Sequence, residues 1–185
     1  MKNSEYILYL DMDGVLVDFN SGYRKLFGKG IRETQDPNGE RAAREKYLAA
    51  GSTFWADLDW IRGGQELWDA SKRLFERVCI LSSAGTTDPI RGQIVEVGKR
   101  LWLKKNMPDM DQSKVFIVLG KYEKKKYASK DGILVDDVRV TIDDWNKAGG
   151  YGILHSSTYY KSTIETLKDV SRPLTLMEIV KRIKH

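Results

Sequence analysis

The stretch that most constrains this chain is residues 6–19, YILYLDMDGVLVDF. Its first five residues form an apolar run that is too short for a helix and is bounded by a turn signal, which is typical of a fully buried strand. Asp11 and Asp13 follow directly, and then Gly14. Residues i and i+2 of an extended segment project to the same side. Two carboxylates are therefore delivered together to the carboxyl end of the strand, where open α/β sheets bind their ligands.

Two carboxylates this close raise each other's pKa unless a cation lies between them. The cation that best fits oxygen ligands of this kind is a hard divalent ion, above all Mg²⁺. A strand followed by a DxDG turn is the alternative, because Asp and Gly favour turns for purely local reasons. The other acids and lysines of the chain decide between a turn and a metal site.

Further along the chain, apolar runs alternate with segments of helical periodicity. This alternation predicts an α/β fold: a Rossmann-like parallel sheet of about five strands with helices on both faces. The expected strands are residues 6–10, 77–81, 115–119, 132–135 and 151–154, and the expected helices are residues 20–27, 40–50, 65–75, 89–105, 121–129 and one through 143–147.

Local signals mark helix starts and the domain organisation. Asp88 is an expected N-cap followed by Pro89 at the first helical position, and two capping boxes, Ser162 with Glu165 and Thr175 with Glu178, are expected to open the last two helices. At 185 residues the chain is expected to form a single domain, 1–185. Residues 20–62 are expected to form a small helical cap inserted after the first strand.

The composition is ordinary for a globular protein, with 41% hydrophobic and 31% charged residues. No apolar run approaches the roughly 18 residues needed to span a membrane, and the start does not resemble a signal peptide. The single cysteine, Cys79, excludes an intrachain disulfide, which favours a cytoplasmic location. The net charge of +5 favours anionic partners without selecting among them.

Polar residues follow several of the expected strands. Ser82 and Ser83 follow the second, lysines 121 and 124–126 follow the third, and Asp136 and Asp137 follow the fourth. Taken singly, these are a turn, a solvated helix face and a helix cap. Together, and in this order at the ends of parallel strands, they converge on one edge and make the set needed to transfer a phosphoryl group.

The chemistry assigns a role to each residue. Asp11, first after the strand, is placed to attack phosphorus and form an aspartyl-phosphate. Asp13 is placed as general acid–base, and Asp137, beside Asp136, would complete the oxygen shell of the metal. Ser82 would donate a hydrogen bond to a phosphate oxygen, and a lysine would supply a compact positive charge.

The segments DMDGVLVDF, ILSS, the lysine-rich stretch and ILVDD, in this order, resemble the four motifs of the haloacid dehalogenase (HAD) superfamily. The resemblance covers residues 6–154. A response-regulator receiver also combines acids, a hydroxyl and a lysine, but its lysine comes last, so the order argues against it.

Within the superfamily the chain resembles the 5'(3')-deoxyribonucleotidases and related phage and bacterial 5'-nucleotidases. The resemblance extends to VDF at 17–19, FWADLDWIRGG, KRLWLKKNMP and WNKAGGYGILH. It implies that Asp11 is the nucleophile and Asp13 the acid–base. It also implies that Mg²⁺ is bound by the Asp11 side chain, the Asp13 backbone carbonyl and Asp137.

The resemblance gives the aromatic residues a role, because Phe19, Phe54 and Trp55 match positions that stack on the base. Ser83 is a further expected substrate-binding residue. The alternative is that these aromatics pack the insertion against the core. For the active-site lysine we select Lys124, which precedes a tyrosine by three residues, although ungapped counting from Asp136 points to Lys126 and one inserted residue points to Lys125.

These observations lead to two functional hypotheses. The first is a Mg²⁺-dependent phosphatase that hydrolyses (deoxy)ribonucleoside monophosphates, with nucleic-acid ends or another small phosphate ester as alternative substrates. A strand-binding groove would require a dense basic patch interleaved with aromatics, which the sequence lacks, so nucleic acid is not favoured. The second is a non-catalytic nucleotide-binding protein with the same fold. The sequence predicts neither a membrane partner nor an oligomeric state.

Overall fold

The computed structural model describes residues 2–30, 45–46 and 48–172. Five strands form one sheet in the order β3-β2-β1-β4-β5, and every pairing is parallel. The strands are β1 (Asn3–Leu10), β2 (Phe75–Ser83), β3 (Val115–Val118), β4 (Gly132–Asp136) and β5 (Tyr151–Leu154). The predicted fold class is therefore confirmed.

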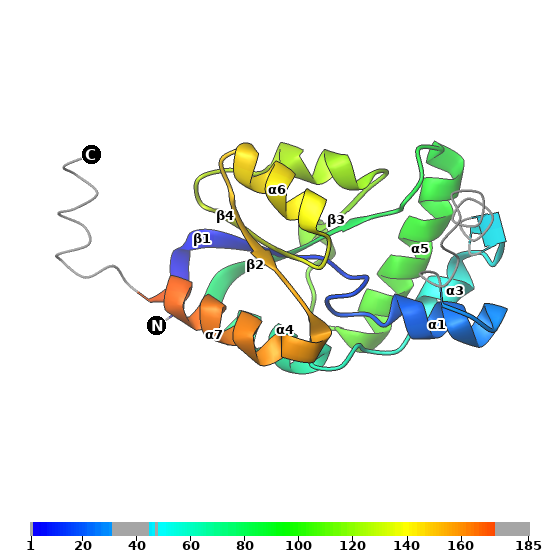
Figure 1. Cartoon of the computed structure of the whole chain (residues 1–185), viewed down its shortest axis with the longest axis horizontal. Coiled ribbons are helices and arrows are strands. Elements are labelled where there is room, and N and C mark those ends of the chain that lie inside the picture. Colours follow the sequence, from blue (N-terminus) through cyan, green and yellow to red (C-terminus); the bar gives the residue numbers. More distant parts are fainter. Residues whose placement is uncertain (1, 31–44, 47, 173–185) are drawn as a thin grey trace.

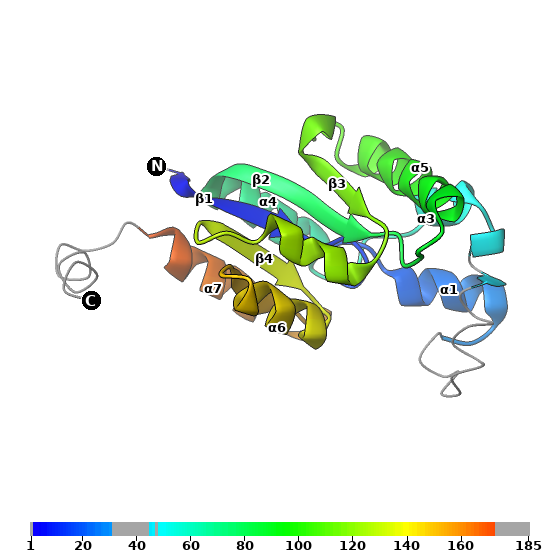
Figure 2. The same cartoon turned by 90° about the horizontal axis from the view of Figure 1, so that it is seen from above.

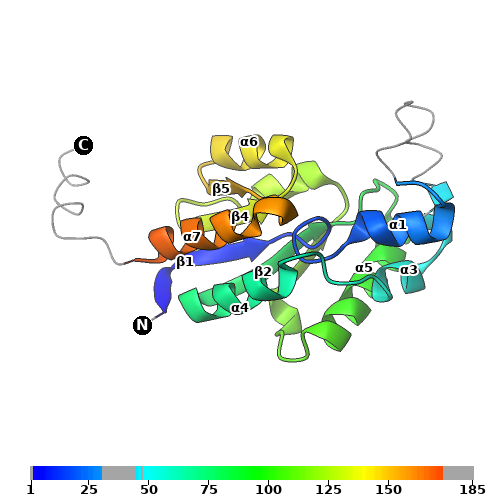
Figure 3. The ribbon, with the colours of Figure 1, turned by 60° about the horizontal axis from the view of Figure 1, so that its bottom comes forward.

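Alternate residues of the central strand pack on opposite faces of the sheet, as an extended backbone requires. Leu8 and Leu10 belong to a core cluster with Leu67 of α4 (Gly64–Leu74) and Leu167 of α7 (Tyr160–Ser171). Tyr9 belongs to a second cluster with Trp145 of α6 (Arg139–Lys147). Figures 1 and 3 show α4 and α7 on one side of the sheet and α6 on the other. Both faces are therefore covered, as predicted.

Further α-helices of the described residues lie together at the right-hand side of Figure 1. They are α1 (Phe19–Phe27), α3 (Ser52–Ala56) and α5 (Pro89–Asn106), and Figure 2 shows α3 lying alongside α5. The indole of Trp102 on α5 donates a hydrogen bond of 2.7 Å to the carbonyl of Leu58, two residues after α3. This bond connects the chain after α3 to α5. A Cβ on Gly98 would lie 2.3 Å from the Ser52 carbonyl oxygen, so only glycine permits the two helices to pack this closely.

Several predicted boundaries need correction. Residues 121–127 form a 3-10 helix (Lys121–Tyr127) in place of the predicted helix to Ser129. Phe75 begins β2 and does not belong to the preceding helix. The capping box at Ser162 is wrong, because a 3-10 turn (Ser157–Tyr159) leads directly into α7, which begins two residues earlier at Tyr160. The Asp88 cap is confirmed, since its carboxylate accepts the amides of Ile90 and Arg91.

Other predictions are only partly covered by the described residues. The predicted capping box at Thr175 lies outside them. Most of the predicted helix over 40–50 also lies outside them, so the insertion predicted at 20–62 is described only in part and stays a prediction. Within the part of the chain that the structure describes, no helix is both long and apolar enough to cross a membrane. Cys79 is buried in β2 as a free thiol.

Candidate active site

The loop after β1 brings the first acidic pair into a tight turn. The amide of Asp11 still donates to Val135 of β4 at 3.0 Å, while the amides of Leu16 and Val17 both donate to the Met12 carbonyl. Gly14 has a φ of 82°, a conformation that favours glycine. A Cβ at this position would lie 2.3 Å from Oδ2 of Asp137. The glycine therefore allows the carboxylate after β4 to approach the loop after β1.

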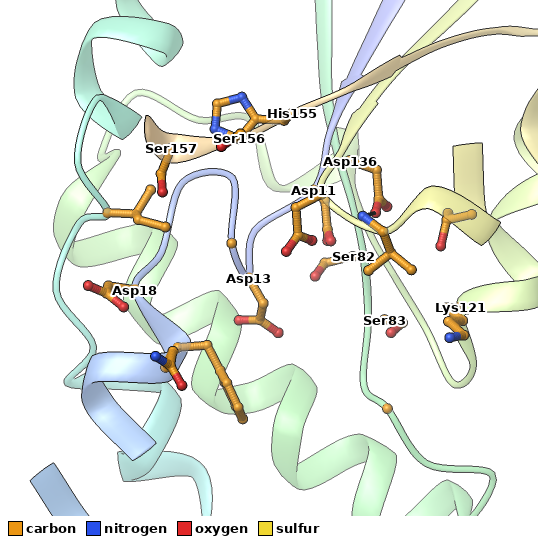
Figure 4. Close-up of a pocket in the computed structure, with 18 of the residues that line it drawn as sticks. Asp11, Asp13, Asp18, Ser82, Ser83, Lys121, Asp136, His155, Ser156 and Ser157 are labelled. Carbon is orange, nitrogen blue, oxygen red and sulfur yellow. Dashed lines mark hydrogen bonds between the residues drawn. The ribbon is translucent and has the colours of Figure 1, made fainter. Parts of the chain in front are cut away.

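Asp11 is buried and its carboxylate is held in one orientation. Its Oδ1 accepts the Met12 amide at 2.8 Å and lies 3.0 Å from Nζ of Lys124. The described residues give no hydrogen bond to the other oxygen, Oδ2. Figure 4 shows Asp11, Ser82 and Asp136 converging from neighbouring strand ends on the same space. Asp11 thus presents one oxygen to the site while the other is fixed by the protein.

Lys124 is the lysine that the fold brings to this carboxylate. Its side chain is 3% exposed, and Nζ lies 2.7 Å from Oδ2 of Asp136 as well as close to Asp11. Burial alone would lower the pKa of Lys124, but the two carboxylates outweigh burial and raise it. Lys125 is exposed, Lys126 pairs with Glu123, and Lys121 lies at the edge of the pocket. The structure therefore places Lys124, and not its neighbours, beside Asp11.

The acids after β4 have two different environments. Both oxygens of Asp136 are engaged, one by Lys124 and the other by the amide of Val138 at 2.8 Å. Burial raises the pKa of Asp137 to about 7, and the nearby carboxylates of Asp11, Asp136 and Asp13 raise it further. Additional positive charge at this edge would therefore favour the ionised form of Asp137.

The same edge has a donor set that fits a hard divalent cation. Asp11, Asp136 and Asp137 each offer a carboxylate oxygen, and these oxygens lie within 4.8 Å of one another. All-oxygen ligation of this kind suits Mg²⁺. The predicted ligands are the side chains of Asp11 and Asp137 and the backbone carbonyl of Asp13. The carboxylate cluster contains Asp11 and Asp137 and adds Asp136, while the side chain of Asp13 points to a lysine of α5, so a metal contact of Asp13 through its carbonyl stays a prediction.

That lysine, Lys99, is the first residue of the segment KRLWLKKNMP, but the sequence patterns gave it no role in the site. Its Nζ lies 2.7 Å from Oδ2 of Asp13, 2.7 Å from Oγ of Ser82 and 2.9 Å from the carbonyl of Ser83. The pKa of Asp13 is raised, because the burial of its carboxyl outweighs the charge of Lys99. A sequence signal was present, since Lys99 lies four residues after Val95 and three before Trp102 on the buried face of α5.

These groups line a pocket of about 730 Å³, a volume typical of ligand sites. Phe19 and Trp55 contribute to its lining, together with Ser82 and Ser83. Phe54 does not: it is buried behind them, with its ring 5.4 Å from that of Phe19 and edge-on to it. Of the three aromatics predicted to contact a base, the structure brings two to the pocket.

The far wall of the pocket comes from the segment after β5. It is formed by His155, Ser156, Ser157 and Thr158. The imidazole of His155 is buried, with Nδ1 3.0 Å from the Thr163 hydroxyl, and burial lowers its pKa to about 4. His155 therefore stays neutral near pH 7 and anchors this wall to α7. Figure 4 shows this wall on the opposite side of Asp11 from Lys121.

The raised pKa of Asp137 yields a stability prediction. The Asp137 carboxyl loses its proton near pH 3.8 in the unfolded chain and near pH 7 in the folded chain. Asp137 therefore destabilises the folded state increasingly as the pH rises through this range. A pKa raised from 3.8 to about 7 corresponds to a destabilisation of about 4 kcal/mol, and partial exposure of Asp137 reduces this figure. We therefore expect Asp137→Asn to stabilise the metal-free protein by about 2 kcal/mol at pH 8. Near pH 4 the gain should vanish.

Urea denaturation in EDTA at both pH values measures this effect, with Asp143→Asn, an exposed acid on α6, as the control. Excess Mg²⁺ at pH 8 should stabilise the wild type more than Asp137→Asn. An equal gain from Asp137→Asn at pH 4 and pH 8 would contradict the electrostatic account of this site.

Comparison with known proteins gives structural matches only: no protein-family model and no curated protein matches the chain. A HAD hydrolase of family IA, variant 3, from Entamoeba histolytica is 15% identical, with a TM-score of 0.51 over 91% of this chain and 100% of its own. A HAD-superfamily hydrolase from Ehrlichia chaffeensis is 13% identical, with a TM-score of 0.51 over 93% of this chain and 100% of its own.

A third solved structure, the HAD family enzyme BT-2542 from Bacteroides thetaiotaomicron, is 11% identical, with a TM-score of 0.52 over 88% of this chain and 98% of its own. At these identities the likeness concerns the arrangement of the backbone. The chain has the α/β fold of the HAD-superfamily hydrolases.

Proposed function

We propose that this protein is a Mg²⁺-dependent phosphatase that hydrolyses (deoxy)ribonucleoside monophosphates through an aspartyl-phosphate on Asp11. One observation carries the proposal. The Asp11 carboxylate has one oxygen held by Lys124 and the Met12 amide, and the other left without a hydrogen bond from the described residues, at a pocket of about 730 Å³. An activated carboxylate at a preformed pocket is the arrangement that nucleophilic catalysis requires.

In the first half of the reaction, Oδ2 of Asp11 attacks phosphorus and the bond from phosphorus to the ester oxygen breaks. Asp13, two residues away on the same loop, gives its proton to the departing oxygen. Its raised pKa favours the protonated form that this step needs. The products of this half-reaction are the free alcohol and a phosphoryl group bound to Asp11.

In the second half, Asp13 is a carboxylate and takes a proton from water as the water oxygen attacks phosphorus. The bond from phosphorus to Asp11 breaks, which releases inorganic phosphate and restores both carboxyl groups. The use of one residue as acid and then as base requires no other proton carrier.

Negative charge on the phosphoryl oxygens is balanced by groups that the fold has already placed. Lys124 supplies a fixed positive charge beside Asp11, and Ser82 supplies a hydroxyl from the end of β2. Mg²⁺, when bound by Asp11 and Asp137 with Asp136 close by, would supply further positive charge to the phosphoryl oxygens.

The nucleotide part of the proposal rests on the aromatic side of the pocket. Phe19 and Trp55 line it from α1 and α3, together with Asp18 and Asn20. A flat apolar ring next to polar groups suits a base attached to a sugar, because bases stack on aromatic side chains. A nucleic-acid end, another small phosphate ester or nucleotide binding without turnover are the alternatives that experiment must separate.

The direct test is phosphate release from a panel of esters, with Mg²⁺ and with EDTA. The panel includes deoxyribo- and ribonucleoside 5'- and 3'-monophosphates, a 3'-phosphorylated oligonucleotide and a sugar phosphate. We expect release that EDTA abolishes and that favours mononucleotides. Release from only the oligonucleotide or the sugar phosphate would contradict the substrate class, and nucleotide binding without any release would support a non-catalytic protein.

The aromatic lining residues Phe19 and Trp55 yield a second prediction. Phe19→Ala should raise the KM for nucleoside monophosphates about 10-fold, because loss of one stacking contact costs about 1–3 kcal/mol. The KM for glycerol phosphate, which has no ring to stack, should change little. The buried Phe54→Leu variant serves as the control for repacking of the aromatic cluster. An equal rise for both substrates would contradict a base-binding role for Phe19.

A further inference from the structure

A second buried lysine reaches the site from α5, the helix that follows β2. The side chain of Lys99 on α5 is 1% exposed. Its ammonium donates hydrogen bonds to Asp13 Oδ2, Ser82 Oγ and the Ser83 carbonyl, at 2.7, 2.7 and 2.9 Å. An ammonium has three donors, so each donor of Lys99 has an acceptor. Lys99 is therefore a fully coordinated charge that joins the loop after β1 to the end of β2.

The packing of α5 also restricts the position of the Lys99 ammonium. Gly98 packs α5 against the backbone of Ser52, and the indole of Trp102 bonds to Leu58, so the helix that bears Lys99 cannot shift freely. A buried charge that lost its partners would cost several kcal/mol. The hydrogen bonds of Lys99 and the packing of α5 therefore both hold its ammonium between Asp13 and Ser82.

The bond to Ser82 determines which way the serine hydroxyl points. Lys99 can only donate, so the Ser82 oxygen accepts and its own proton is directed elsewhere. Ser82 lines the pocket next to Asp11. Its hydroxyl proton is thus available to an acceptor in the pocket, as a phosphate oxygen would be.

The bond to Asp13 separates the two oxygens of that carboxyl. Oδ2 is held by Lys99, whereas Oδ1 is buried without a partner among the described residues. Because Oδ2 accepts from Lys99, Oδ1 is the oxygen of Asp13 whose lone pairs remain open to a proton. Fixing Oδ2 restricts rotation of the carboxyl and keeps Oδ1 in one place, as proton transfer to a departing oxygen requires.

The two buried lysines of the site have different partners. Lys124 contacts Asp11 and Asp136, while Lys99 contacts Asp13 and Ser82. We propose that Lys99 is a positioning residue that orients the general acid–base Asp13 and the phosphate-binding hydroxyl of Ser82. This inference rests on the proposed phosphatase function and adds to it a residue that acts on departure of the leaving group.

The test compares two esters that differ in their need for a proton. p-Nitrophenolate leaves without protonation, whereas the alcohol of a nucleoside monophosphate requires a proton from Asp13. Lys99→Met should lower kcat/KM about 100-fold for the nucleoside monophosphate and less than about 10-fold for p-nitrophenyl phosphate. Loss of a residue with a merely structural role would lower kcat/KM equally for both esters. The ratio of the two losses therefore measures how far Lys99 acts through the proton donor Asp13.

Controls are available within the same chain. Lys124→Met removes the other buried lysine and should lower kcat/KM similarly for both esters, because it acts on the phosphoryl charge. Lys104→Met, an exposed lysine on α5, should change neither. In an Asp13→Asn background Lys99→Met should add little further loss for the nucleotide, because the group that it positions is already absent.

Circular dichroism and a thermal melt establish that each variant is folded, and Lys99→Gln replaces Lys99→Met if the latter does not fold. Equal losses for both esters in an active, folded variant would overturn the role of Lys99 while leaving the phosphatase intact. A folded wild type that releases phosphate from neither ester would overturn the proposed function, and the inference with it.

Discussion

The site depends on the balance of charge at one edge of the sheet. Four carboxylates meet there, and two buried lysines lie among them: Asp11, Asp13, Asp136, Asp137, Lys99 and Lys124. With all six ionised, two negative charges are in excess. Burial raises the pKa of Asp137 to about 7, and the neighbouring carboxylates of this cluster add to the rise. A divalent cation carries the charge that would neutralise the excess, and this links the metal proposal to the electrostatics of the protein itself.

The parts that could be predicted from the sequence follow from local rules. Apolar runs of strand length alternating with helical segments predict a parallel sheet, and in such a sheet every strand end lies at one edge. Asp11, Ser82 and Asp136 were therefore expected to meet, and the structure brings them together (Figure 4). The selection of Lys124 from four nearby lysines agrees with its burial against Asp11.

The parts that could not be predicted depend on how helices pack. Lys99 enters the site only because α5 turns that side chain inward, and a lysine within an apolar helical stripe is easily taken for a solvated residue. Phe54 and Trp55 are consecutive in α3 and point about 100° apart, and the packing of this helix decides that Trp55 lines the pocket and Phe54 does not. The bond from Lys124 to Asp136 likewise depends on tertiary contacts.

The most direct test of the account is to trap the phosphoryl group on Asp11. The Asp13→Asn variant, in which hydrolysis of the intermediate is slowed, is mixed with p-nitrophenyl phosphate and Mg²⁺, quenched, and reduced with borohydride. Hydride converts an aspartyl-phosphate to homoserine and releases phosphate, so peptide mass spectrometry should find homoserine at position 11. Homoserine at another aspartate, or none at all from a protein that hydrolyses the ester, would contradict Asp11 as the nucleophile.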